Sequence, residues 1–130
     1  MIGLWKSHAG KYLIVAGIAM LVFFGIPILL VPLDWARVFG WQIPPPGPLV
    51  LFFGRSLGLF VCVIALFALR VAANPQAQRF FFDLMLWLFV AMIGLHVYGA
   101  IMGVQPITET IEIALWVMLI IATLLFYPKG

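Results

Sequence analysis

Four stretches of the chain are almost entirely apolar, and each is long enough to cross a lipid bilayer. A spanning helix needs about 20 mostly apolar residues. We expect spans over residues 10–31, 48–73, 78–103 and 106–126. Asn74-Pro75 and the segment from Gly103 to Pro106 are typical of tight turns between helices. Short turns make consecutive helices antiparallel, so the sequence predicts an all-α, four-helix antiparallel membrane bundle in a single domain, residues 1–130.

The connection over residues 33–47 is longer than the other turns and rich in aromatic side chains. Asp34 is placed to cap a short helix that runs to Trp41, and Trp35 is of the residue type enriched at membrane interfaces. Arg37 adds a charge, and Pro44-Pro45-Pro46 requires an extended backbone. We expect an interfacial helix and a stiff strap, with a lid or a docking surface as the alternative. Within the first span, Pro27 is expected to kink the helix.

Composition supports a membrane protein and excludes several other classes. The chain is 66% apolar and 8% charged, whereas soluble domains are about 25% charged. A net charge of +3 gives no indication of nucleic-acid binding. Cys62 has no cysteine partner, and His8 and His96 are the two histidines of the sequence. We find no metal-ligand spacing and no sign of a cofactor.

The charges outside the spans predict the orientation of the chain. Lysine and arginine gather on the cytoplasmic side of membrane proteins. Arg37 lies on the side of the long loop. The other side carries five cations: Lys6, Lys11, Arg70, Arg79 and Lys129. We therefore expect a multi-pass protein of the inner (plasma) membrane with both termini in the cytoplasm.

Three ionisable residues are predicted at one depth inside the bilayer. Arg55 lies seven residues after Pro48, His96 seven before Gly103, and Glu112 six after Pro106. At 1.5 Å of rise per residue, all three lie about 9–11 Å below the outer interface. Charged residues at such depths cost several kcal/mol, so they mark candidate functional sites.

This cluster has three interpretations. Arg55 is expected to pair with Glu112, and His96 with Glu112 or with Glu109, one turn shallower. The cluster is then either a structural contact between helices, or a site for a ligand or proton, with Tyr98 and Trp116 lining it. The third interpretation is that Arg55 alone extends to the outer headgroups.

A short motif resembles one found in small DoxX-like bacterial membrane proteins. It is the arginine-bearing, glycine-rich second helix, Leu51-Phe52-Phe53-Gly54-Arg55-Ser56-Leu57-Gly58, in a chain of four spans. That family includes proteins found as subunits beside redox partners. The resemblance covers the architecture and this one motif, and it carries over no catalytic residue.

Three functions are compatible with these patterns. The first is a non-enzymatic subunit that contacts the bilayer and another membrane protein or a second copy of itself. The second is a binding site, or an enzyme, for a hydrophobic or amphipathic ligand whose anionic group Arg55 would hold. The third is a small proton-coupled transporter. The sequence favours the first and leaves catalysis undecided.

Overall fold

The computed structural model describes residues 1–129, and all regular secondary structure within them is helical. Four of them are long and apolar enough to span a membrane: Lys6–Leu30, Pro48–Val71, Pro75–Met102 and Ile107–Phe126. A short helix, α3 (Pro32–Val38), lies between the first two. The predicted all-α class with four spans is therefore confirmed, and the chain is a polytopic membrane protein whose apolar helices contact lipid. The spans begin and end within four residues of the expected positions.

The chain divides into two compact units. Unit 1 combines residues 1–12 with the chain from Val71 onward, and unit 2 is Leu13–Arg70. Each unit is described by itself below. That the two form a single membrane domain stays a prediction.

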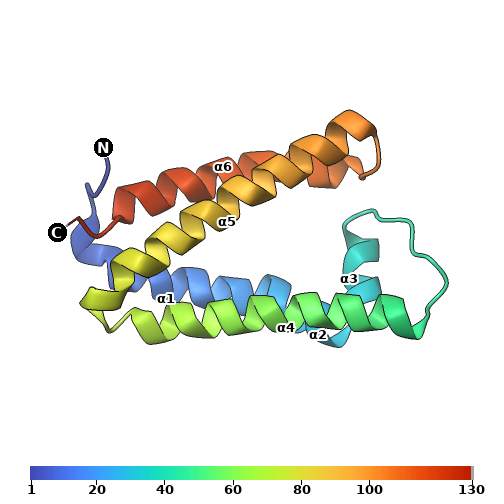
Figure 1. Ribbon diagram of the computed structural model, residues 1–130, viewed down its shortest axis with the longest axis horizontal. Helices are drawn as coiled ribbons and strands as arrows, with labels where there is room; N and C mark the ends of the chain where they lie inside the picture. The colour runs from blue at the N-terminus through green and yellow to red at the C-terminus, as the bar shows by residue number, and fades with distance from the viewer. Residues whose placement is uncertain (130) are drawn as a thin grey trace. The chain divides into compact units, whose positions relative to one another are not determined.

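Two antiparallel helices make up most of unit 1. Helix α5 (Pro75–Met102) and helix α6 (Ile107–Phe126) lie side by side and are joined by a short turn (Figure 1). Helix α5 begins three residues before the expected start because Asn74 caps it, its side chain accepting hydrogen bonds from the backbone N–H groups of Gln76 and Ala77. A proline suits the first position of a helix, where its missing N–H costs nothing. Gly103 ends α5 in the left-handed conformation, with φ of 64°.

The N-terminal segment lies against the end of α6 in unit 1. The backbone N–H groups of Gly3 and Trp5 donate to the carbonyls of Leu124 and Leu125, each at 2.8 Å. These carbonyls belong to the last turn of a helix, where no partner exists within the helix itself. Both termini therefore lie at the same end of unit 1 (Figure 1).

Tyr127, just beyond the last span, connects the end of α6 to α5. Its hydroxyl donates to Asp83 Oδ1 at 2.6 Å. This hydrogen bond to a carboxylate raises the pKa of the Tyr127 phenol above its ordinary value, because the bond favours the protonated form.

In unit 2 the first span contains an irregular turn in front of Pro27. Helix α1 (Ala9–Met20) passes into a π-helical turn, η2 (Leu21–Gly25), before helix α2 (Ile26–Leu30). Pro27 has no N–H to donate to the carbonyl four residues earlier, that of Phe23. The indole Nε1 of Trp35 donates to this carbonyl instead, at 3.0 Å. A π-helical turn thus precedes Pro27, and the side chain of Trp35 donates to the carbonyl that the proline cannot reach; the kink expected at Pro27 stays a prediction.

Removal of this indole donor is expected to destabilise unit 2. In the variant Trp35→Phe the ring stays and the N–H is lost, so the Phe23 carbonyl loses its donor. We expect a loss of about 1–2 kcal/mol in the free energy of unfolding, measured by reversible unfolding in detergent. Trp87→Phe is the matched control, since Trp87 is 74% exposed, and a loss of equal size there would contradict the assignment.

The short helix α3 differs from its predicted bounds. It begins at Pro32 and ends at Val38, and its N-cap is Val31, which makes no side-chain capping bond. The prediction that Asp34 caps a helix running to Trp41 is therefore wrong. Proline at the first position fixes φ for the helix, and the N-cap lies three residues earlier than predicted, at Val31 instead of Asp34. Asp34 lies in the first turn instead, where its Oδ1 accepts a hydrogen bond from Arg37 at 2.7 Å.

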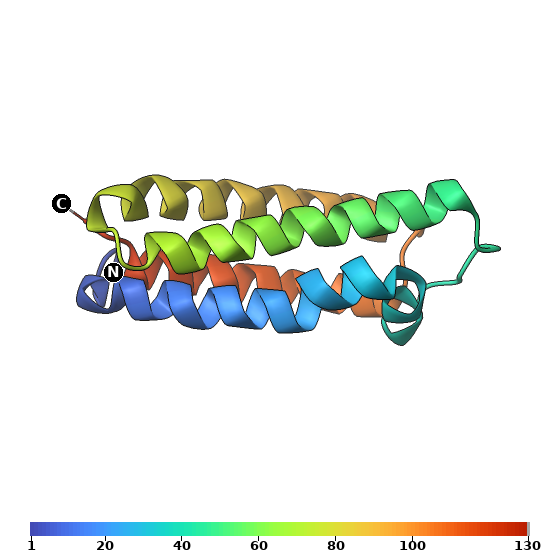
Figure 2. The same ribbon diagram turned by 90° about the horizontal axis from the view of Figure 1, so that it is seen from below.

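Glycines of helix α4 (Pro48–Val71) allow a close approach to the first span and α3 within unit 2 (Figure 2). A Cβ on Gly58 would meet the backbone of Leu29 and of Ile28, and one on Gly54 would lie 2.6 Å from Pro32 Cβ. The close helix packing expected from the spacing of these two glycines is present in the structure.

Candidate functional site: a buried histidine–carboxylate cluster

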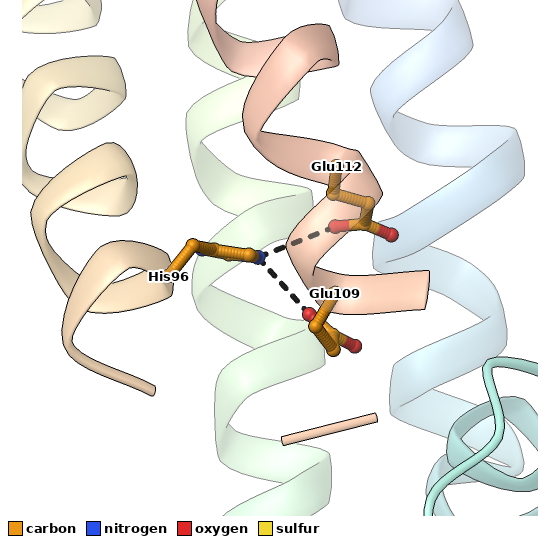
Figure 3. Close-up of side chains that lie close together, drawn as sticks. All are labelled: His96, Glu109 and Glu112. Atoms are coloured by element: carbon orange, nitrogen blue, oxygen red, sulfur yellow. Dashed lines mark hydrogen bonds and ion pairs between the residues drawn. The ribbon is translucent and has the colours of Figure 1, made fainter. Parts of the chain in front are cut away.

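Helices α5 and α6 bring three ionisable side chains together inside unit 1. His96 lies six residues before the end of α5, and Glu109 and Glu112 lie in the first two turns of α6. The two glutamates are three residues apart, so they share one face of the helix. Figure 3 shows both carboxylates directed toward the His96 ring from α6.

The distances place one ring nitrogen between two carboxylates. His96 Nε2 lies 3.0 Å from Glu109 Oε2 and 3.5 Å from Glu112 Oε2. His96 is 4% exposed and Glu109 is 9% exposed. Electrostatic interactions in such a water-poor setting are much stronger than at a protein surface.

The backbone of α5 fixes which nitrogen of His96 faces the carboxylates. His96 Nδ1 lies 2.7 Å from the carbonyl oxygen of Met92, one turn earlier on the same helix. A carbonyl oxygen only accepts hydrogen bonds, so Nδ1 carries a hydrogen. In the neutral ring, Nε2 is then the nitrogen whose lone pair points toward Glu109 and Glu112.

The charges of the cluster do not balance by themselves. Two carboxylates carry two negative charges when ionised, and one imidazolium supplies at most one positive charge. A buried charge without compensation is strongly unfavourable. The three side chains taken alone therefore carry a net negative charge whenever both glutamates are ionised.

Gln105, in the turn between α5 and α6, supports the cluster and was missed by the sequence analysis. Its Nε2 donates to the carbonyl of His96 at 2.9 Å and to Thr110 Oγ1 at 3.0 Å. The bonds join the turn to both helices beside the ionisable groups. A lone glutamine in a predicted turn gives no recognisable sequence signal, since its partners depend on how the turn folds.

Gly99 leaves the space that the Gln105 side chain occupies. A Cβ on Gly99 would meet Gln105 Oε1, and Gly103 is the C-cap of α5. These two glycines therefore serve the turn, and Gly99 serves it by admitting the glutamine.

The variant Gly99→Ala is expected to displace Gln105 and to break both of its hydrogen bonds. We expect a loss of about 1–3 kcal/mol in the free energy of unfolding. In the double variant Gly99→Ala/Gln105→Ala the methyl group has room, so the two losses should not add. Strictly additive losses in a thermal unfolding series would show that the two positions do not interact.

Trp116 lies beside the cluster and contains an unsatisfied donor. Its ring centre is 5.9 Å from that of His96 and 5.7 Å from that of Phe89. Its indole Nε1 is buried and has no hydrogen-bond partner among the described residues. Buried donors of this kind are rare and call for an explanation such as a bound ligand or water.

The remaining predicted site residues lie elsewhere. Tyr98 is 60% exposed, and it lies two residues from His96, on the opposite side of α5. Arg55 is an exposed residue of α4 in unit 2, and its pairing with Glu112 stays a prediction. The four interfacial residues of the long loop also belong to unit 2: Asp34, Trp35, Arg37 and Trp41.

The cluster also has the donor atoms of a metal site. His96, Glu109 and Glu112 each offer one ligand atom, and these atoms lie within 4.8 Å of one another. Sequence spacing gave no sign of this set because its donors come from two helices, and His96 and Glu109 are 13 positions apart.

Comparison of the chain with protein-family models, curated proteins and solved structures finds no match in any of the three. The chain has four long apolar helices, as a small four-span membrane protein does, and it is assigned to no family.

Proposed function

We propose that this protein binds a cation from the aqueous phase at the His96–Glu109–Glu112 cluster, and that this binding is its function in the membrane. The observation that carries the proposal is the position of His96 Nε2 between the buried carboxylate of Glu109, at 3.0 Å, and the partly buried carboxylate of Glu112, at 3.5 Å. A site with more negative than positive groups favours a cation. It does not favour the anionic ligand that the sequence analysis considered as a partner of Arg55. Ionisable groups inside a span are in general functional.

The depth of the cluster supports uptake from water. Glu109 lies two residues inside α6, and His96 lies six residues from the end of α5. These positions are about 3 Å and about 9 Å from the helix ends. The distribution of lysine and arginine assigns this end of α5 and α6 to the outer side of an inner membrane, with both termini in the cytoplasm.

A thermal-shift screen tests the proposal on the full chain in detergent. Chlorides of sodium, potassium, magnesium, calcium, manganese and zinc serve as probes. A cation that binds only the folded protein adds about 2.7 kcal/mol at 100 times its dissociation constant. We expect at least one of them to raise the midpoint of the wild type and to leave the variant His96→Leu/Glu109→Gln/Glu112→Gln unchanged. No shift for any cation, or equal shifts in both proteins, would contradict the proposal.

A second candidate function is that of a subunit in a larger membrane assembly, and one face of α5 favours it. Asp83, Leu86, Trp87 and Val90 line an open hollow of about 240 Å³. They recur at helical spacing, so they share one side of α5. An exposed carboxylate beside a hollow suits a partner helix that carries lysine or arginine.

Native mass spectrometry of the protein from its own membrane tests this second function. We expect a second polypeptide, or a second copy of this chain, at fixed stoichiometry, and we expect its loss in Asp83→Asn. An unaccompanied monomer, or an assembly that Asp83→Asn leaves intact, would count against it.

A further inference from the structure

We propose that the His96–Glu109–Glu112 cluster is a site for one divalent transition-metal ion, bound by His96 Nε2 and by one oxygen from each glutamate. This inference rests on the cation-binding function proposed above and names the class of cation. Four features of the cluster lead to it: its spacing, its charge, its donor types and its orientation.

The spacing of the donor atoms suits a single small ion. Metal–nitrogen and metal–oxygen bonds in such sites are about 2.1 Å long, so two donors on one ion lie about 3.0 Å apart at a right angle and about 3.4 Å apart at the tetrahedral angle. His96 Nε2 is 3.0 Å from Glu109 Oε2 and 3.5 Å from Glu112 Oε2. All three donor atoms lie within 4.8 Å of one another, so adjustments of the glutamate side chains would bring them onto one ion.

The charge of the cluster selects a divalent ion. Two carboxylates and a neutral imidazole carry two negative charges, and a doubly charged cation neutralises them completely. A monovalent cation leaves one negative charge buried, which is costly in a water-poor site. One divalent ion therefore matches the two negative charges of the carboxylates.

The donor types and their orientation select a transition metal. Magnesium and calcium prefer oxygen ligands alone, whereas imidazole suits zinc, copper, iron and nickel. The Nδ1–H of His96 donates to the Met92 carbonyl at 2.7 Å. Metal-ligating histidines almost always hold their second nitrogen in this way, which presents the other nitrogen to the metal.

Three protein ligands leave at least one position of the ion open for water or another oxygen ligand. Trp116, the residue beside His96, has a buried indole N–H without a hydrogen-bond partner among residues 1–129. An oxygen held by the ion is the kind of acceptor that this donor lacks. The unsatisfied indole is thus an observation independent of the three ligands.

Titration with Co²⁺ and Zn²⁺ tests the site on the full chain in detergent, purified with an affinity tag that contains no histidine. We expect one equivalent of Co²⁺ to give visible absorption bands of nitrogen–oxygen ligation, and Zn²⁺ to displace it. In His96→Gln and Glu112→Gln the affinity should fall by more than about 100-fold, because even groups behind the ligands contribute 10–100-fold. His8→Gln and Asp83→Asn are matched controls outside the cluster and should bind as the wild type does.

A measurement on the wild type alone keeps the test decisive if a variant fails to fold. The zinc X-ray absorption spectrum should show nitrogen and oxygen ligands at about 2.0–2.1 Å, with one imidazole and no sulfur. Two imidazoles, a sulfur ligand, or unchanged affinity in both folded variants would overturn the metal site. Binding of magnesium or calcium without cobalt or zinc would overturn it while the proposed function stands, and absence of all cation binding would overturn both.

Discussion

The variant His96→Leu is expected to lose about 3–5 kcal/mol of the free energy of unfolding in metal-free buffer, the range measured when one partner of a buried ionic contact is removed. The histidine lies 3.0 Å from Glu109 and 3.5 Å from Glu112. Leucine fills a similar volume and offers no donor, so it leaves two carboxylates in a buried setting without their common partner.

Neutralising the whole cluster is expected to restore much of this loss. The triple variant His96→Leu/Glu109→Gln/Glu112→Gln has no charge left to bury, and replacement of complete buried ionic groups is often close to neutral. Unfolding by a graded detergent series, followed by circular dichroism, measures both proteins. A triple variant less stable than His96→Leu would show that the glutamates contribute through contacts other than the histidine.

The variant Gly58→Ala is expected to disrupt unit 2. The new methyl group would lie 2.6 Å from Leu29 Cα and 2.7 Å from the carbonyl carbon of Ile28. Backbone atoms cannot move aside as a flexible side chain does, so α4 must shift away from α2. Overpacking of this kind costs about 1–3 kcal/mol, and occasionally more.

Gly94 provides the matched control for this substitution. It is also a helical glycine, but a Cβ there would meet nothing within 4 Å. Gly94→Ala should therefore be neutral or stabilise the protein by about 1 kcal/mol, since alanine has the higher helix propensity. Equal midpoints for the two variants in thermal unfolding would refute the close packing at Gly58.

Sequence periodicity and turn residues were sufficient to predict the spans. Gly103 and Pro106 place the turn between α5 and α6 within a residue of its observed position. Counting residues from that turn placed His96 and Glu112 at one depth in the bilayer. This common depth is the reason why the cluster was predicted. Helix α5 begins earlier than predicted, because hydropathy does not register a capping side chain such as that of Asn74.

The partners of buried polar groups were harder to predict. Depth alone left Glu109 and Glu112 as alternative partners of His96, and the structure places both within 3.5 Å of it. The bonds of Gln105 and the bond from Trp35 to the Phe23 carbonyl depend on how a turn and a short helix fold back. Residue spacing in the sequence does not predict such contacts, so they are identified only from the folded structure.

The discontinuous composition of unit 1 has a consequence for biosynthesis. Residues 1–12 leave the ribosome well before α6, yet their backbone donors at Gly3 and Trp5 bind carbonyls of Leu124 and Leu125. More than a hundred residues must therefore be translated and α6 inserted before this segment finds its partners. Until then the backbone N–H groups of Gly3 and Trp5 lack these partners, so unit 1 is completed only after α6 has formed.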